Sequence, residues 1–344
     1  MAITIKDIAK RTGVSHSTVS RALGGNSLIS EATTTRIKKV AREMGYQPSA
    51  AARSLKTNQT KVIGVIVNSI DDPFFSEILF GIENEAQQAG YSLFIAASQY
   101  DPIREQNIVH TMMEQRTDGV IICSSSFSAD KGRQLLANGF PVVVVNSKAN
   151  ENFNYSIYHD VVDGSRQLTR HLLELGHTKI AYLGNSKSGR TSLDRLNGFQ
   201  TEMVNAGIEI HPDLIYEVQG SEPNLGVESL EYFLGLPDQP TAILCFNDML
   251  AIGLLQACHL KGIKVPYDLS VTGFDNITFS AYTNPPLTTL DQPKYSIGNE
   301  AARLLLDLLS HKIESSNSTH KVKILKGRLL VRSSTTTPRV EGKK

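Results

Sequence analysis

From Lys61 onward, short runs rich in β-branched residues alternate with segments of helical periodicity that often end in glycine. Such alternation is typical of parallel sheets built from βαβ units. Eight runs are more than one open sheet usually needs, and the irregular, polar segment SKANENFNYSIYHD separates the fourth run from the fifth. We therefore expect an α/β fold with two similar lobes. The runs are VIGVIVN, YSLFIAA, DGVIICS, PVVVVN, KIAYLGN, LIYEVQ, TAILCFND and LSVTGFDN.

Polar and aromatic side chains follow several of these runs. Ligands of open α/β sheets bind beyond the carboxyl ends of the strands, so these side chains should line a cleft. Fixed carboxylates, amides and a guanidinium pair well with hydroxyl groups, and an aromatic ring gives a flat apolar face, which favours a sugar or similar polyol. The residues alone leave open a cap role for Asp275 and a surface ion pair for Arg195. The candidate cleft residues are Asn68, Asp72, Phe74, Asn146, Arg195, Asn247 and Asp275.

The first residues of the chain predict a unit of three helices. Thr4 is the expected cap of a helix from about Ile5 to Arg11, which Gly13 ends. Ser15 opens the second helix, HSTVSRAL, after a Gly-Val-Ser turn, and a third helix lies in EATTTRIKKVAREMGY. All three carry apolar residues at helical spacing, so they should pack on a small common core.

Charge is divided unevenly along the chain. Residues 1–61 hold eleven basic and three acidic side chains, a net charge of +8, whereas the remaining 24 basic and 31 acidic side chains give −7. The asymmetry indicates a polyanion, above all nucleic acid, as partner of the first part, although a solvated basic surface would look the same. Residues 47–61 have little to bury and resemble a linker, in which a short alanine-rich helix would be marginal alone.

Other classes of protein fit the sequence poorly. No apolar run approaches the roughly 18 residues of a membrane span, and charges occupy the start where a signal peptide needs apolar residues, so we expect a cytoplasmic protein. The motifs GxGxxG after the first strand, GxxxxGK[ST], HExxH and GxSxG are absent, and the histidines are scattered. We expect no enzyme, no cofactor and no metal, and reduced core thiols at Cys123, Cys245 and Cys258.

The segments IKDIAKRTGVSHSTVSRALGG and GYQPSAAARSL together resemble the DNA-binding head of the LacI/GalR family of transcription regulators. VIGVIVNSIDDPFF, DGVIIC, RLNGF, AILCFND, GFDN and LTTLDQP resemble that family's effector domain, a fold shared with periplasmic sugar-binding proteins. The resemblance implies a repressor in which a bound effector changes the angle between the lobes. The expected parts are a helix-turn-helix head (residues 1–46), a hinge linker (47–61), an effector-binding and dimerisation domain (62–337) and a polar tail (338–344).

In this resemblance the second helix of the head enters the major groove, with His16 and Ser17 at positions of base choice and Arg21 near a guanine or a phosphate. Leu55 matches a leucine that two paired hinge helices insert into the minor groove, and Ala52 permits their close packing. The alternatives are an exposed His16 without a role and a Leu55 that packs on the rest of the protein. The expected DNA-binding residues are Thr4, Ser15, His16, Ser17, Thr18, Ser20, Arg21, Ser49, Ala52 and Leu55.

The resemblance also makes Arg195 and Asp275 the principal effector contacts. Two positions depart from the family: His159-Asp160 replaces an Asp-Asn pair, and Ser221 or Glu222 replaces an aromatic residue. The ending TTTPRVEGKK lacks apolar heptads for a bundle, so we expect a dimer on a palindromic operator rather than a tetramer. A transport-type or cytoplasmic sugar-binding protein without DNA function is the alternative, against which the basic head and the missing signal peptide argue.

Overall fold

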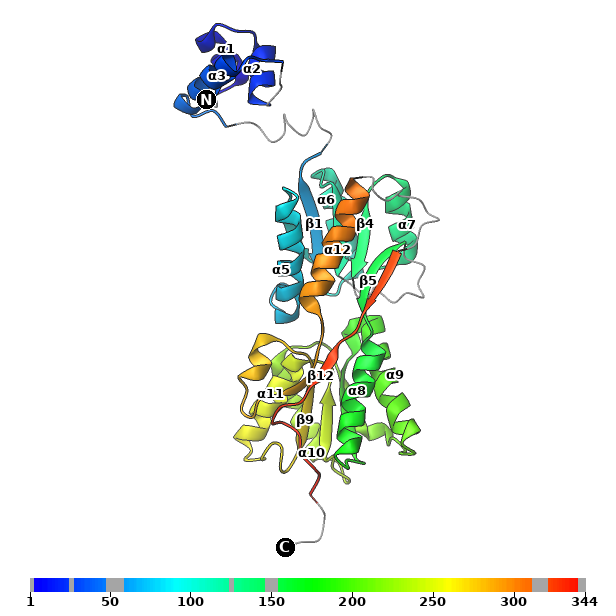
Figure 1. The fold of residues 1–344 in the computed structure, drawn as a ribbon. Coiled ribbons are helices and arrows are strands. Elements are labelled where there is room, and N and C mark those ends of the chain that lie inside the picture. Colours follow the sequence, from blue (N-terminus) through cyan, green and yellow to red (C-terminus); the bar gives the residue numbers. More distant parts are fainter. Residues whose placement is uncertain are drawn as a thin grey trace. The chain divides into compact units, whose positions relative to one another are not determined.

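A computed structural model of the chain describes residues 3–24, 28–47, 59–123, 127–145, 154–310 and 321–339. The chain divides into two compact units, Met1–Thr60 and Lys61–Lys344 (Figure 1). Among the described residues, no helix is both long and apolar enough to cross a membrane.

The first unit consists, in its described part, of three helices that share one apolar core. The Ser15 hydroxyl caps the second helix by accepting a hydrogen bond from the Thr18 amide at 3.1 Å. Gly13 has a φ of +69°, a left-handed conformation that glycine adopts at little cost, and it ends the first helix. The helices are α1 (Ile5–Thr12), α2 (His16–Leu23) and α3 (Glu31–Glu43). Their core consists of Ile8, Ala9, Val19, Ala22, Ile37 and Ala41.

The second unit contains two six-stranded sheets within the described residues, one in each lobe. The first lobe has the strand order β11-β5-β4-β3-β1-β2, and the second has β12-β10-β9-β8-β6-β7. All pairs are parallel except that between β10 and β12, as the alternation of strands and helices predicts. The first sheet comprises β1 (Val62–Val67), β2 (Ser92–Ala97), β3 (Gly119–Cys123), β4 (Val142–Val145), β5 (Tyr155–His159) and β11 (Lys321–Leu325). The second comprises β6 (Ile180–Asn185), β7 (Ile215–Val218), β8 (Ala242–Cys245), β9 (Ser270–Asp275), β10 (Thr288–Asp291) and β12 (Arg328–Leu330).

Helices cover both faces of each sheet, so the central strands, such as β3 and β4 in the first lobe and β8 and β9 in the second, are buried. In the first lobe, α5 (Pro73–Gln88) packs against α12 (Lys294–Leu309), while α6 (Pro102–Glu114) and α7 (Ala129–Ala137) contribute to the opposite core. In the second lobe, α8 (Val161–Glu174) packs against α9 (Gly189–Asn205), and α10 (Pro223–Leu234) against α11 (Asp248–Leu260). Three short 3₁₀ helices lie in the described residues of this lobe: η2 (Ser186–Ser188), η3 (Pro212–Leu214) and η4 (Thr278–Ala281).

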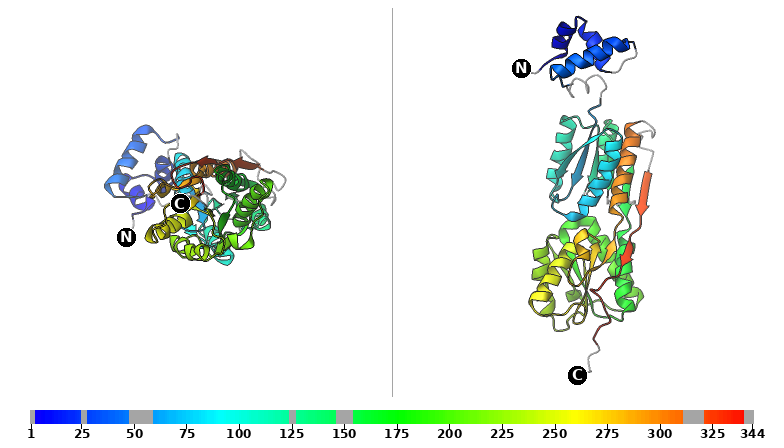
Figure 2. Two further views of the ribbon diagram at one scale, coloured as in Figure 1. Left: turned by 90° about the horizontal axis from the view of Figure 1, so that it is seen from below. Right: turned by 60° about the vertical axis from the view of Figure 1, so that its left-hand side comes forward.

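The described chain passes between the lobes three times, after β5, after β10 and after β11 (Figure 2). We call these passages the first, second and third crossings. The first follows His159, the second contains Gln292, and the third contains Gly327.

Part of the segment SKANENFNYSIYHD, expected to be irregular, is a strand. Tyr155 and Ile157 are buried in the first lobe, and β5 pairs with β4 on one side and β11 on the other. The segment was misjudged because its strand is short and mixes polar with apolar residues. Strand β10, which follows an Asn-Pro-Pro turn, and the two late strands β11 and β12 were also not expected.

Candidate functional site

A cavity of about 340 Å³ lies where the carboxyl ends of the two sheets meet. Asn68 follows β1 and Cys123 ends β3, and the strand order of the first sheet reverses between these two strands. In the second sheet Asn247 follows β8 and Asp275 ends β9. Open α/β sheets bind their ligands at such points of reversal. In the second sheet the order reverses between β6 and β8, so Asn247 lies beside the reversal and Asp275 one strand further along.

Arg195 and Asp275 form a buried ion pair beside this cavity. The Nη2 atom of Arg195 lies 3.3 Å from Asp275 Oδ1, and each side chain is 6% exposed. The guanidinium lies over the rings of Phe246 and Phe274, at 4.3 and 3.8 Å from their centroids, and Nη1 donates to the Phe246 carbonyl oxygen. The surface ion pair that the sequence left open for Arg195 is therefore excluded.

Burial dominates the electrostatics of Asp275. It raises the pKa of this carboxyl group, and the charge of Arg195 opposes the shift only in part. The Gln292 side-chain amide donates to Asp275 Oδ1 at 2.5 Å. Asp275 thus has two donors on one carboxylate oxygen and lines the cavity, a position from which a carboxyl group can accept hydrogen bonds from a ligand.

Asp72 approaches the cavity from the first lobe. It caps α5, where its Oδ1 accepts a hydrogen bond from the Phe74 amide at 3.0 Å, and burial raises the pKa of its carboxyl group. Phe74 is buried and packs edge-on against Phe75, with ring centroids 5.1 Å apart. In the second lobe Asn247 caps α11 in the same way: its Oδ1 accepts a hydrogen bond from the Leu250 amide at 3.0 Å. These caps fix the side chains that line the cavity.

His159 lies at the junction of the crossings and also lines the cavity. Its Nε2 accepts a hydrogen bond from the Gly327 amide at 2.8 Å, which joins the first crossing to the third. Burial lowers the pKa of His159 to about 3, and the nearby Gln292 side chain, in the second crossing, offsets the shift only in part. The imidazole is therefore neutral at physiological pH, and its Nε2 acts as a hydrogen-bond acceptor.

Six of the seven candidate cleft residues lie around this one cavity, and Asn146 lies outside the described residues. Arg190, Gln292, Asp160 and Ser221 line it as well, and Arg190 Nε pairs with Asp194 Oδ1 at 3.0 Å. Several other lining residues were not predicted from the sequence, although Phe246 and Asp194 are sequence neighbours of the predicted Asn247 and Arg195. Phe75 lines the cavity beside Phe74, and the further lining residues are Tyr100, Tyr158, Val161, Val162, Ser188, Thr191, Asp194, Asn197 and Phe246.

In the head, three of the predicted DNA-contacting residues of α2 are exposed to solvent. Val19 and Ala22 are fully buried, whereas His16, Ser17 and Arg21 are exposed. Thr18 and Ser20 are half-buried, and the exposed Ser15 hydroxyl is 2.7 Å from that of Ser17. Thr4 donates its amide to Asp7 Oδ2 at 2.8 Å, which fixes the start of α1. The candidates Ser49, Ala52 and Leu55 lie outside the described residues.

Within the described ranges, no group of three or more His, Cys, Asp or Glu side chains is arranged to hold a metal ion. The three cysteines are buried and free, and burial raises the pKa of the Cys123 and Cys258 thiols to about 12. Such thiols stay protonated and pack as small apolar groups.

Comparison with known proteins gives matches to both parts of the chain. Residues 4–49 match the family described as bacterial regulatory proteins, lacI family, and residues 169–335 match the periplasmic binding protein-like domain. The HTH-type transcriptional repressor PurR of Aliivibrio salmonicida is 36% identical over 310 residues, covering 90% of this chain and 93% of the relative. PurR of Haemophilus influenzae (strain PittEE) is 35% identical over 322 residues, covering 93% and 95%.

Solved structures show the same architecture. The Lac repressor dimer bound to operator and the anti-inducer ONPF has a TM-score of 0.87 at 26% identity, covering 98% of this chain and all of that one. A LacI family regulator from Enterococcus faecium with bound ribose gives 0.72 at 27% identity, over 81% of this chain and all of the other. The CelR–cellobiose complex gives 0.71 at 26%, covering 96% and 99%.

The α/β fold with a helical head and two lobes is thereby confirmed, and the relatives are regulators rather than enzymes. The chain belongs to the LacI family of bacterial regulatory proteins and is a DNA-binding regulator of that family.

Proposed function

We propose that the protein is a repressor whose affinity for a palindromic operator is controlled by a small polar effector, a sugar, bound in the cavity between the lobes. The observation that carries the proposal is the buried Arg195–Asp275 pair beside a cavity to which both lobes contribute. Relatives that are 33–36% identical over most of the chain are named as repressors, which supports the direction of control.

A ligand that contacts both lobes can change the angle between them. Asp72 and Phe74 belong to the first lobe and Arg195 and Asp275 to the second, so an effector among them binds one relative arrangement of the lobes better than another. Such a ligand shifts the equilibrium only by its differential affinity for the two arrangements. In a dimer, the same change alters the spacing of two heads and hence their fit to two half-sites.

The composition of the cavity favours a polyol. Carboxyl groups at Asp72, Asp160 and Asp275, with the amides of Asn68 and Asn247, offer acceptors and donors matched to hydroxyl groups. Aromatic side chains supply apolar faces for a sugar ring. Relatives of the same fold are described with ribose and with cellobiose, which supports the sugar class. A planar heterocycle such as a purine is the second candidate, because the same aromatic faces could stack on it.

On the DNA side, His16, Ser17 and Arg21 would meet the bases, with Ser15 and Ser20 also facing the DNA and Thr4 and Thr18 contacting phosphates. Ser49, Ala52 and the minor-groove wedge Leu55 belong to the hinge of the same proposal. The exposed positions on α2 support the first three assignments. The protein would act in the cytoplasm, where its DNA target lies.

Two measurements test the proposal. Thermal-shift screening of the full-length protein against ribose, cellobiose, other sugars, adenine and guanine should give a shift with one sugar. Fluorescence anisotropy on a DNA site selected by the protein should then show weaker binding when that sugar is added. A shift with a purine and none with sugars would correct the effector class. An unchanged DNA affinity at saturating ligand would refute control by the cavity.

A further inference from the structure

Lys294 is a buried lysine that the proposed effector contacts do not explain. It is the first residue of α12, directly after the second crossing, and it is 1% exposed. A buried ammonium group is costly unless hydrogen bonds and opposite charges compensate it. The groups that compensate the ammonium group of Lys294 therefore indicate its role.

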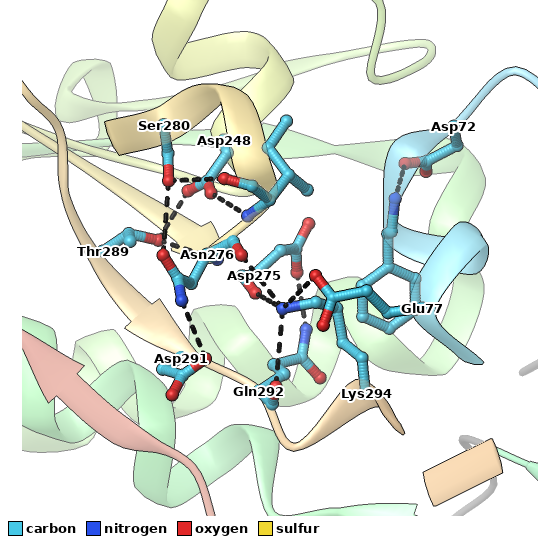
Figure 3. Close-up of polar contacts among 12 residues, drawn as sticks. Asp72, Glu77, Asp248, Asp275, Asn276, Ser280, Thr289, Asp291, Gln292 and Lys294 are labelled. Carbon is cyan, nitrogen blue, oxygen red and sulfur yellow. Dashed lines mark hydrogen bonds and ion pairs between the residues drawn. The ribbon is translucent and has the colours of Figure 1, made fainter. Parts of the chain in front are cut away.

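The ammonium group of Lys294 binds backbone carbonyl oxygens at the edge of the cavity (Figure 3). Nζ donates to the carbonyl oxygens of Asp275 at 2.6 Å and Asn276 at 3.0 Å, and to that of Gln292 at 3.5 Å. Its ion-pair partner is Glu77 on α5, whose Oε1 lies 3.5 Å away and whose side chain is 45% exposed. Lys294 thus contacts three backbone carbonyl oxygens and a single, partly exposed carboxylate. Its main interaction is therefore with the backbone.

The backbone that Lys294 holds is strained. Asp275 has a φ of +127° and Asn276 a φ of +52°, so two consecutive residues with side chains occupy conformations that glycine favours. Such conformations persist only where the surroundings enforce them. The two carbonyl oxygens point at Nζ, and the amides of Asn276 and Ile277 donate to Thr289 Oγ1 at 3.3 Å and Asp248 Oδ2 at 2.8 Å.

Lys294 also joins the two lobes. Its backbone belongs to α12, which packs against α5 so closely that a Cβ on Gly298 would come within 2.0 Å of the Ile78 carbonyl oxygen. Its ammonium group, in contrast, is fixed to the end of β9 in the second lobe. One side chain thus connects the helix pair of the first lobe to the turn that carries Asp275.

We propose that Lys294 is a positioning residue: its ammonium group holds the Asp275–Asn276 turn in the strained conformation that keeps the Asp275 carboxyl group beside Arg195 and the cavity. The inference rests on the proposed function in that Asp275 is taken as an effector contact. Lys294 acts through Asp275 and is not itself a lining residue of the cavity.

Hydrogen–deuterium exchange of the full-length protein without any small molecule tests the positioning directly. In Lys294→Met, the amides of residues 276–277 should exchange at least tenfold faster than in the wild type, while peptides from β6 exchange as before. Glu77→Gln is the matched control: it keeps the carbonyl contacts, and exchange should stay within twofold of wild type. Unchanged exchange in Lys294→Met would overturn the proposal. Should that variant fail to fold, Lys294→Gln must show the same acceleration in a smaller degree.

A double-mutant cycle separates positioning from a general effect on folding. The probe is the sugar or purine of the screening panel that gives the largest thermal shift. Lys294→Met should bind it at least tenfold more weakly, and adding this change to Asp275→Asn should weaken binding by no more than a further twofold, because Lys294 acts through Asp275. Additive losses, or wild-type affinity in Lys294→Met, would contradict the inference. Wild-type affinity in Asp275→Asn would instead refute the proposed effector site, and hydrogen exchange would still decide the role of Lys294.

Discussion

The His159 imidazole accepts a hydrogen bond from the Gly327 amide at 2.8 Å and so ties the first crossing between the lobes to the third. The approach is close: a Cβ on Gly327 would lie 2.6 Å from His159 Nε2. Because this buried histidine is neutral in the folded protein, we expect the stability of the larger unit to be sensitive to mild acid.

Stability should fall as the pH drops below about 6.5, the ordinary pKa of histidine. Burial lowers the pKa of His159 to about 3, so between these values the unfolded chain binds a proton that the folded protein does not. The contribution of His159 is complete above pH 6.5 and declines on acidification by at most about 1.4 kcal/mol per pH unit. Urea unfolding of the wild type and of His159→Gln between pH 5 and 7.5 measures this contribution to the free energy of unfolding.

The free energy of unfolding of His159→Gln should change less with pH than that of the wild type, but it should still change. Burial also lowers the pKa values of His171 and His177, so these residues retain part of the slope. His259→Gln, at an exposed position of α11, is the control and should follow the wild-type curve. Equal slopes in His159→Gln and wild type would show that His159 is protonated in the folded protein.

Removing one partner of the Arg195–Asp275 pair should cost more than replacing both. Arg195→Ala leaves the buried Asp275 carboxyl group without its cation, and we expect a loss of about 3 kcal/mol in the free energy of unfolding. The double variant Arg195→Met with Asp275→Leu should lose less, because no uncompensated charge remains. Chemical denaturation at pH 7 measures both variants. A double variant that is less stable than Arg195→Ala would show that the pair itself stabilises the fold.

Gly298→Ala should destabilise the first lobe by about 1 to 3 kcal/mol, the usual range for overpacking. A Cβ there would lie 2.0 Å from the Ile78 carbonyl oxygen, and backbone cannot move aside as a side chain can. Gly235→Ala is the control, since its nearest contacts would be 3.4 and 3.5 Å. Thermal unfolding compares the two variants, and equal melting temperatures would mean that α5 and α12 separate easily.

Deleting residues 1–60 should abolish DNA binding while the larger unit remains folded, because each unit has its own core. For the full-length protein, the logarithm of the affinity should fall with the logarithm of salt concentration at a slope of about −0.9 per neutralised phosphate. Anisotropy at several salt concentrations gives this slope, and circular dichroism checks the truncated protein. DNA binding by the truncated chain would place the binding surface elsewhere.

The sequence predicted most of the fold because its signals were local. Apolar spacing and caps such as Ser15 located the helices of the head, and the β-branched runs located eight of the strands. The late strands β11 and β12 were missed because their pairing partners lie more than a hundred residues away for β11 and about forty for β12, so nothing near them in the sequence signals a sheet.

The candidate site was predictable to the extent that its residues follow strands. That rule and the family resemblance pointed to Asp72, Asn247 and Asp275. The rule could not find Lys294, because its role depends on the strained turn at Asp275 and on the packing of α12 against α5. Contacts between backbone carbonyl oxygens and a distant side chain leave no local pattern in a sequence.

The most direct test of the account is the operator affinity of Asp275→Asn, compared with that of the wild type, with and without the sugar found by screening. Asp275 lines the cavity and lies in the larger unit, not in the head. We predict that both proteins bind the operator equally without sugar, and that saturating sugar weakens the wild type at least tenfold but Asp275→Asn less than twofold. A full response in Asp275→Asn, with wild-type sugar affinity by calorimetry, would contradict effector control through this cavity.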